Sequence, residues 1–470
     1  MSKKNNSSNQ NKNPNAKQSA NASQNSNVKP SSSAKNSSPK QASDGIYDAR
    51  SLGAPKVAML GLQHMFAMFG ATILVPMLTG LDVSTTLLFA GLGTLLFHFL
   101  TKRKVPAFLG SSFAFLPGYF AIAPKGEANL LPYACVGVAC AGLLYLILSA
   151  LIKVFGSGKV MKFFPPIVTG PLIIAIGLTL SQTALDSCAD NWIIAFAAII
   201  LILVCNIWGK GMVKIVPIII GVIGSYLVAV ALGEVDFAKV ATADWIGLPI
   251  HFESTAFWAF KDGNTGLLIT AIITIVPIAL ATIVEHMGDI SAISSTVGRN
   301  FVEDPGLHRT LLGDGLATIL AALFGAPANT TYGENTGVLS LTKVYDPLVI
   351  RLAAGFAILF SFCPKFAAVI GSMPTATVGG VSLVLYGMIS AVGVRNIVEA
   401  KVDFTKSRNV IIAALILVLS IGIKFNTFYG DGAIKIPLII AGKPTTILVT
   451  GLAAGALIGI LLNAILPDKE

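Results

Sequence analysis

Residues 329–337 read Asn-Thr-Thr-Tyr-Gly-Glu-Asn-Thr-Gly, and long apolar runs lie on both sides of them. A soluble protein would place such a polar, glycine-containing stretch on its surface. The rest of the sequence instead predicts that the stretch lies within a membrane. A carboxylate such as Glu334 is unfavourable at membrane depth, so its presence there indicates a functional site.

The composition is that of a polytopic membrane protein. Of the 470 residues, 54% are hydrophobic and 12% are charged, and the mean hydropathy is +0.75. Globular domains carry about 25% charged residues, so a soluble core of this size would lack a surface to face water. The five cysteines are scattered through apolar runs, which indicates small buried hydrophobes rather than disulfides or a metal site. We therefore expect no metal and no other cofactor.

The amino-terminal tail carries most of the net charge of +10. Residues 1–50 contain seven lysines and one arginine against two aspartates, and most of their other side chains are polar. This composition predicts a disordered cytoplasmic tail, and it gives no reason to expect a nucleic-acid partner. The tail either attracts anionic lipid headgroups weakly or is a solvated extension that the membrane domain does not need.

Fourteen apolar stretches follow the tail, and they approach the roughly 20 residues that a helix needs to cross a bilayer. They make up a predicted membrane domain over residues 55–467. The longest connection, residues 234–265, divides them into seven and seven. The predicted spans are 57–79, 83–101, 105–123, 129–155, 160–181, 191–208, 213–233, 266–288, 309–325, 327–342, 347–371, 374–394, 409–425 and 444–466.

Basic residues set the orientation of these spans, because Lys and Arg accumulate in short cytoplasmic loops. The loops after the second, fourth and sixth spans are basic, whereas most loops on the other side are mixed or acidic. The last outer loop is an exception, with three lysines against one aspartate. We therefore expect both termini on the cytoplasmic side of the cytoplasmic (inner) membrane.

An internal repeat is visible in the sequence. Seven spans are an odd number, so the second half must enter the membrane from the opposite side, and such inverted repeats are typical of secondary transporters. The repeats are predicted over residues 55–235 and 264–467. Three residue pairs share a separation of 221 positions: His64 and Glu285, Phe113 and Glu334, and Pro106 and Pro327.

The third and tenth spans, 105–123 and 327–342, form one of these repeated pairs and contain Gly and Pro. Neither span can be an uninterrupted helix facing lipid, because its freed backbone groups need partners. Interrupted segments at matching places in two halves point to a binding site at the membrane midplane. The alternative is two structural breaks without a ligand, and we favour the site because acidic residues accompany it.

Acidic residues at the end of the eighth span suit proton transfer. Glu285 and Asp289 are four residues apart, so a helix places them on one face. Two carboxylates at membrane depth repel each other and resist desolvation, which favours their protonated forms. Alternatively, Glu285 pairs structurally with His64 or His286, and Asp289 is a helix-end charge. His64 is either a proton carrier or a packing residue. Asp314 either lines the site or bonds across to the tenth span, and we expect the second.

Other mechanisms have less support in the sequence. It contains no G-x4-G-K-[ST] loop, so an ion gradient would have to drive transport. A channel is less consistent with paired carboxylates and broken helices than a closed binding site is. An intramembrane enzyme would need a catalytic constellation, and neither an H-E-x-x-H motif nor a metal cluster is present.

At these residues the chain resembles the nucleobase–ascorbate transporters, most closely the bacterial uracil permeases among them. The resemblance implies fourteen spans in two inverted seven-span repeats, arranged as a core domain and a gate domain. It also implies short antiparallel strands in the third and tenth spans, and a homodimer. The matching stretches are 63–72, 110–115, 285–288, 304–309 and 329–337.

The resemblance also implies the roles of individual residues. Glu285 and Glu334 would hydrogen-bond the edge of a pyrimidine, and the backbone amides of Phe113 and Gly333 would serve its carbonyl groups. Three side chains would shape the pocket: Phe113, Ala71 and Tyr332. Asp314 and Asn335 would be structural polar residues near it.

These observations predict uracil import by proton symport and alternating access. Protonation of Glu285, assisted by Asp289 or His64, would be linked to substrate binding. Glu334 favours uracil, because the xanthine and urate branch of the family usually carries Gln at this place. Asp289, however, resembles that branch, since some uracil permeases have His there. A xanthine or other purine permease therefore remains the alternative.

Overall fold

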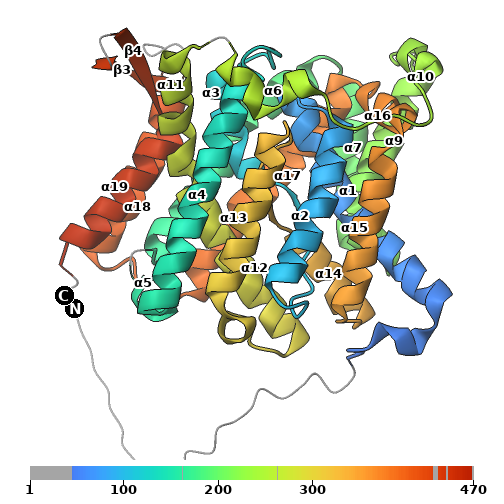
Figure 1. The fold of residues 1–470 in the computed structure, drawn as a ribbon, viewed down its shortest axis with the longest axis horizontal. Helices are drawn as coiled ribbons and strands as arrows, with labels where there is room; N and C mark the ends of the chain where they lie inside the picture. Colours follow the sequence, from blue (N-terminus) through green and yellow to red (C-terminus); the bar gives the residue numbers. More distant parts are fainter. Residues whose placement is uncertain are drawn as a thin grey trace, which may run out of the picture. The chain divides into compact units, whose positions relative to one another are not determined.

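The structure is a computed structural model dominated by helices (Figure 1). It describes residues 45–160, 162, 164–261, 263–426, 432–440 and 443–467, so residues 1–44 of the predicted tail lie outside it. Residues 46–50, which we also assigned to the tail, differ from that expectation because they contact residues 343–346. The apolar side chains of Ile46 and Ala49 find partners around Val344, which explains the difference.

The chain forms nineteen numbered α-helices and four strands in its described part. Residues up to 242 form α1 (Ala54–Thr79), α2 (Val83–Leu100), β1 (Leu109–Ser111), α3 (Leu116–Ile122), α4 (Leu131–Phe155), α5 (Ser157–Val160), α6 (Pro166–Ala189), α7 (Trp192–Trp208), α8 (Met212–Ile215), α9 (Pro217–Ala231) and α10 (Ala238–Thr242). Residues from 265 form α11 (Thr265–Ile275), α12 (Ala279–Val297), α13 (Leu307–Leu323), β2 (Asn329–Thr331), α14 (Gly333–Thr342), α15 (Pro347–Ser361), α16 (Pro364–Gly371), α17 (Thr375–Glu399), α18 (Ser407–Lys424), β3 (Ala433–Ile440), β4 (Lys443–Thr450) and α19 (Gly451–Ile465).

Seven described helices are long and apolar enough to cross a membrane, and the bent pair α15 and α16 would make an eighth. Shorter apolar helical stretches occur at Phe113–Ile122, α7, α9 and α19. Each of the fourteen predicted spans contains helical residues, and two of them differ from the expectation of a single span.

The predicted span 347–371 is divided into α15 and α16, whose axes differ by 86°. Pro364 begins α16, and the residue before a proline is disfavoured in the helical conformation, which ends α15. The predicted span 444–466 is helical only from Gly451, because residues 443–450 form strand β4, paired with β3. Its threonine- and valine-containing sequence favours a strand, and Thr450 caps α19 by accepting a hydrogen bond from the Ala453 N–H.

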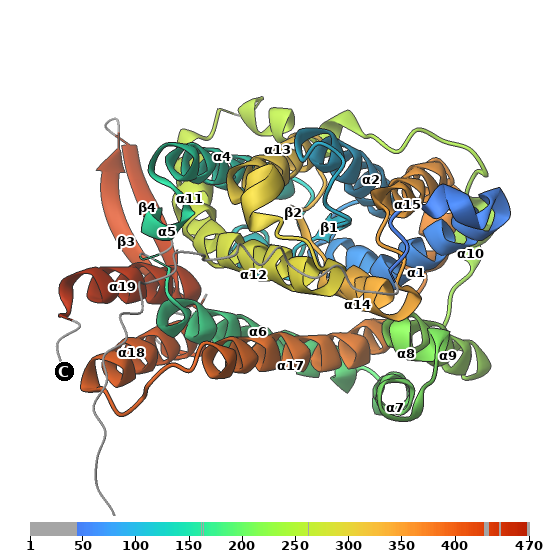
Figure 2. The same cartoon turned by 90° about the horizontal axis from the view of Figure 1, so that it is seen from below.

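The helices form two layers (Figure 2). In one layer, α6 packs along α17, and α7, α9 and α18 join them. The other layer contains α1, α2, α4, α11, α13 and α15, with α2 in contact with both α13 and α15. β1, β2, α12 and α14 also belong to this second layer, and α12 reaches α6 of the first.

Strands β1 and β2 pair antiparallel between the helices, as expected for the two interrupted spans. The paired residues are Leu109 with Thr331, Gly110 with Thr330, and Ser111 with Asn329. Gly110 is required at this crossing, because a Cβ atom there would lie 2.5 Å from a ring carbon of Tyr332. The strand pair brings residues from the two halves of the sequence together.

Threonines of flanking helices form hydrogen bonds with backbone groups at the outer edges of this strand pair. The Thr94 hydroxyl of α2 accepts from the Leu109 N–H at 2.9 Å and lies 3.2 Å from the Leu109 carbonyl oxygen. On the other strand, the Thr318 hydroxyl of α13 donates to the Asn329 carbonyl at 2.8 Å. The Asn329 side chain in turn donates to the Phe89 carbonyl at 3.0 Å. A two-stranded ribbon can therefore be buried without leaving these groups unpaired.

Candidate functional site

The acidic residues singled out in the sequence meet where α12 faces the start of α14. Glu285 and Asp289 lie one helical turn apart on α12, and both are half-buried. Glu334 lies in the first turn of α14, directly after β2. Glu285 is within electrostatic range of Glu334 and Asp314. The structure thus places the two carboxylates of the predicted pyrimidine site on two helices that contact each other, α12 and α14.

Helix α14 begins beside these acids, at Gly333. The residue before it, Tyr332, makes no side-chain capping hydrogen bond to the helix. The first N–H groups of a helix have no partner within the helix and can bind a ligand. A Cβ atom on Gly333 would lie 3.8 Å from the Asp289 carboxylate, so the helix start lies against α12. A ligand here would meet N–H donors and carboxylates together.

The three predicted pocket-shaping residues lie near the strand pair. Tyr332 is buried, and its hydroxyl donates to the Ser111 carbonyl at 2.8 Å. Ala71 on α1 is fully buried and belongs to the same apolar cluster as the Tyr332 ring. Phe113 is half-buried and packs against three apolar clusters. The Tyr332 hydroxyl is thus engaged within the protein, and its ring is the part available to shape a pocket.

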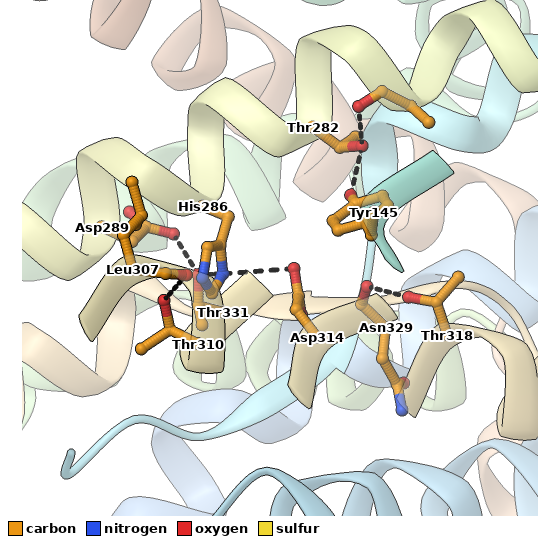
Figure 3. A network of polar contacts seen from close by, with 11 residues as sticks. Tyr145, Thr282, His286, Asp289, Leu307, Thr310, Asp314, Thr318, Asn329 and Thr331 are labelled. Atoms are coloured by element: carbon orange, nitrogen blue, oxygen red, sulfur yellow. Dashed lines mark hydrogen bonds and ion pairs between the residues drawn. The ribbon is translucent and has the colours of Figure 1, made fainter. Parts of the chain in front are cut away.

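A polar network connects α12 with β2 and α13 (Figure 3). The Thr331 hydroxyl donates to the Asp289 carboxylate at 2.9 Å and lies 3.4 Å from Nδ1 of His286. That same nitrogen lies 3.2 Å from the Asp314 carboxylate. His286 and Asp314 are both fully buried. Asp289 is therefore held by the strand pair and is not a helix-end charge contacting a loop.

Two expectations about these groups are corrected. We expected Asp314 to bond across to the tenth span, but it pairs with His286 of α12. The Asp314 carboxylate and the Thr331 hydroxyl both approach Nδ1 of this imidazole (Figure 3). We also considered a structural pairing of Glu285 with His64 or His286. Within the described residues no hydrogen bond or ion pair joins them, since His286 is engaged with Asp314.

His64 lies on the other side of α14. It is fully buried, and the Asn335 amide donates to its Nδ1 at 3.1 Å and to its carbonyl at 3.1 Å. An amide N–H can only donate, so Nδ1 accepts and carries no proton in this arrangement. Asn335 follows Glu334 directly, so α14 connects the histidine with the acidic group. Two residues singled out in the sequence, His64 and Asn335, are thus hydrogen-bonded to each other.

Sequence reasoning missed three side chains at this place. His286 and Thr331 hold Asp289 and Asp314, and the adjacency of His286 to Glu285 was the available signal. Tyr386 reaches the site from α17 in the other layer, with its ring 6.3 Å from that of Phe113. Its buried hydroxyl has no hydrogen-bond partner among the described residues. No sequence pattern indicated that α17 approaches Phe113.

A cavity of about 1170 Å³ lies between the two layers, away from the acids. Its lining comes from α3, the end of α1 and the starts of α11 and α17, together with Thr183 and Ser187 near the end of α6. Glu285 and Glu334 are not among its lining residues. Phe113 packs with Met77 and Val378, which do line it. The Phe113 ring therefore lies between the cavity and the strand pair.

The described residues contain no cluster of three or more His, Cys, Asp or Glu side chains arranged to hold a metal ion.

Over residues 55–427 the sequence matches a permease family. The chain belongs to the nucleobase–ascorbate transporter family. The resemblance noted from the motifs is thereby confirmed. Members of this family are permeases, which are multi-pass membrane transport proteins and not enzymes.

Curated relatives and a solved structure agree with this membership. The uracil permease of Bacillus caldolyticus is 41% identical over 419 residues, covering 87% of this chain and 92% of the relative. The uracil permease of Bacillus subtilis (strain 168) is 39% identical over 422 residues, with the same coverage. The transmembrane domain of the cyanobacterial bicarbonate transporter BicA aligns with a TM-score of 0.56 at 13% identity, covering 89% of this chain and 99% of that domain. This last likeness identifies the fold of the permease.

Proposed function

We propose that this permease imports uracil together with protons. The observation that carries the proposal is the position of Glu334, which β2 presents at the start of α14 in electrostatic range of Glu285. The names of the relatives, which are uracil permeases at about 40% identity, support the choice of substrate. A second candidate substrate is xanthine, and the presence of Asp289 favours it as described above.

The chemistry of the site supports a pyrimidine ligand. A uracil edge alternates N–H donors with carbonyl acceptors. Carboxylates of Glu285 and Glu334 would accept from its N–H groups, and the amides of Phe113 and Gly333 would donate to its carbonyls. A pocket built this way rejects analogues that leave its buried groups unpaired. Ala71, Tyr332 and Phe113 would form its apolar walls.

Proton coupling would use groups that are already connected in the fold. Glu285 and Asp289 share a face of α12, and each is close enough to feel the charge of the other. Neutralising one by a proton would therefore reduce the repulsion next to the place where Glu285 and Glu334 would bind the substrate. His64 would assist through Asn335 and α14. Asp314 and Asn335 would serve as structural partners.

Alternating access would arise from movement between the two layers. We assign the layer containing α1, α12 and α14 as the core domain, and the layer containing α6 and α17 as the gate domain. The contact between Phe113 and Tyr386 joins the two. The fourteen-span arrangement as inverted repeats, cytoplasmic termini and a homodimer belong to the same proposal. The cavity between the layers would open to the outer side of the cytoplasmic membrane.

Uptake of labelled uracil into proteoliposomes tests the function. An inward-directed proton gradient should drive accumulation, a protonophore should abolish it, and unlabelled xanthine should compete weakly. Stronger competition by xanthine than by uracil would assign the purine instead. Equal uptake under a sodium gradient without a proton gradient would disprove proton coupling. Currents that do not saturate would indicate a channel.

A further inference from the structure

Residues 45–50, which precede α1, cross the ends of two helices that carry the proposed site; we refer to them as the strap. The Ile46 N–H donates to the Lys343 carbonyl at 2.8 Å, and its carbonyl accepts from the Tyr345 N–H at 2.8 Å. The Ala49 N–H donates to the Asp346 carboxylate at 2.9 Å. The strap is thus bonded along the connection between α14 and α15.

The same strap reaches the end of α12 through Tyr47. The Tyr47 hydroxyl donates to the Val297 carbonyl at 2.6 Å. The Arg299 guanidinium lies over its ring at 4.4 Å, and the Tyr345 ring is 5.4 Å away on another side. Cation–π contacts and ring pairs of this kind hold a side chain in one place. Tyr47 therefore joins the last turn of α12 to the residues that follow α14.

These two attachment points lie at the far ends of the helices that hold the carboxylates. Val297 is twelve residues beyond Glu285 on α12, which corresponds to about 18 Å along a helix. Lys343 is nine residues beyond Glu334 on α14, or about 13 Å. Because α12 and α14 also contact each other, the strap and this contact together constrain how the two helices lie.

We propose that the strap is a positioning device for substrate binding, with Tyr47 and Asp346 as its positioning residues. It fixes the distance between the ends of α12 and α14 and thereby the geometry of the carboxylate pair. Its significance for binding rests on the proposed function. The effect of the strap on the two helices does not depend on the proposed function, and it can be measured without substrate.

Two conservative variants of the full-length protein remove strap contacts selectively. Tyr47→Phe deletes the hydrogen bond to Val297 and retains the ring contacts. Asp346→Asn keeps an oxygen to cap α15, where Asp346 accepts from the Leu348 N–H at 2.8 Å. The new amide NH2 group then faces the Ala49 N–H, and because both groups are donors, the hydrogen bond between Ala49 and residue 346 is lost. The matched controls are Tyr226→Phe, which loses a hydrogen bond to Ser372 in another part of the fold, and Asp82→Asn, which alters the cap of α2.

The first readout is the dissociation constant for labelled uracil. Each strap variant should raise the constant by about two- to fivefold, a range that the loss of one hydrogen bond can produce. The controls should stay within twofold of the wild type, because Tyr226→Phe loses a hydrogen bond far from the strap and Asp82→Asn keeps the oxygen that accepts from Thr85. Equal dissociation constants in strap variants and wild type would show that the strap only stabilises the fold.

The second readout is the distance between spin labels at Ser291→Cys on α12 and Leu341→Cys on α14, in a background without native cysteines. Tyr47→Ala, which also removes the ring, should broaden this distance distribution, and Tyr226→Ala should not. An unchanged distribution in Tyr47→Ala overturns the proposal whatever the substrate is. If the wild type does not bind uracil but the distribution broadens, the proposed function fails and the strap's effect on the helices stands.

Discussion

The imidazole of His286 lies 3.2 Å from the carboxylate of Asp314, and neither side chain reaches solvent. The contact joins α12 to α13 behind the residues that face the proposed site. At the same ring nitrogen, Nδ1, Thr331 connects the imidazole to Asp289. The position of Asp289 therefore depends on groups from three separate segments of the chain.

Asp314→Ala should lower the stability of the protein. The substitution leaves His286 buried without its partner, which costs about 2 kcal/mol or more. Thermal unfolding of the purified protein measures the change. His286→Ala and the double variant complete the comparison, and the double variant should lose less than both single losses together, because it leaves neither group unpaired. Additive losses would show that the two side chains do not interact.

Thr331→Val should impair transport while leaving the fold intact. Valine has nearly the shape of threonine and suits a strand, but it cannot donate to Asp289. Loss of this hydrogen bond to Asp289 should reduce uracil uptake by about tenfold. The matched control is Thr330→Val, since the Thr330 hydroxyl has no partner among the described residues. Equal uptake by both variants would contradict a role for the Thr331 hydroxyl.

Glu334→Gln should reduce uracil affinity more than it reduces protein stability. A neutral amide presents a donor where the carboxylate accepts, so we expect about a 10- to 100-fold loss in uptake at low substrate concentration. Competition by xanthine should increase at the same time. Normal uracil transport by both Glu334→Gln and Glu285→Gln would refute the assignment of the site.

Gly110→Ala should destabilise the strand pair. The added methyl group would lie 2.5 Å from the Tyr332 ring and 2.6 Å from the Thr72 hydroxyl, and overpacking of this kind costs about 1–3 kcal/mol. Gly355→Ala is the control, because nothing lies within 4 Å of a Cβ atom there. In the middle of α15 that substitution should be neutral or stabilise by up to about 1 kcal/mol. Melting temperatures of the two variants provide the comparison.

Thr183→Cys should react with a membrane-impermeant thiol reagent added outside intact cells. Thr183 lines the cavity between the layers, on the face that we assign to the outside. The experiment uses a background without the five native cysteines. Thr94→Cys, in the buried edge of the strand pair, should remain unlabelled. Labelling of Thr183→Cys only in inverted membrane vesicles would reverse the proposed orientation.

The interrupted spans could be predicted from the sequence because they leave local signals. Gly110 and Pro327 interrupt apolar runs, and equal separations in the two halves indicated that the interruptions correspond. The pairing of β1 with β2, by contrast, was expected only from the resemblance to the transporter family. Glu285 and Asp289 shared a face because helix geometry alone requires it.

Other features depend on contacts that leave no local pattern. The pairing of Asp314 with His286 depends on how α13 crosses α12, and the strap at Ile46 depends on a connection almost 300 residues away. Tyr386 approaches the site only because α17 lies against the other layer. The residues of β4 are apolar enough to resemble part of a membrane span, so hydropathy could not distinguish the strand from a helix.

The threonines beside β1 and β2 have a mechanical consequence. An open sheet edge would be intolerable in lipid, and Thr94 and Thr318 act as substitutes for the missing neighbouring strands. The edge groups of the two strands are therefore hydrogen-bonded within the same layer of helices. In the alternating access proposed above, the ribbon would move relative to α17 while Thr94 and Thr318 stay bonded to it, and the ring contact between Phe113 and Tyr386 would change.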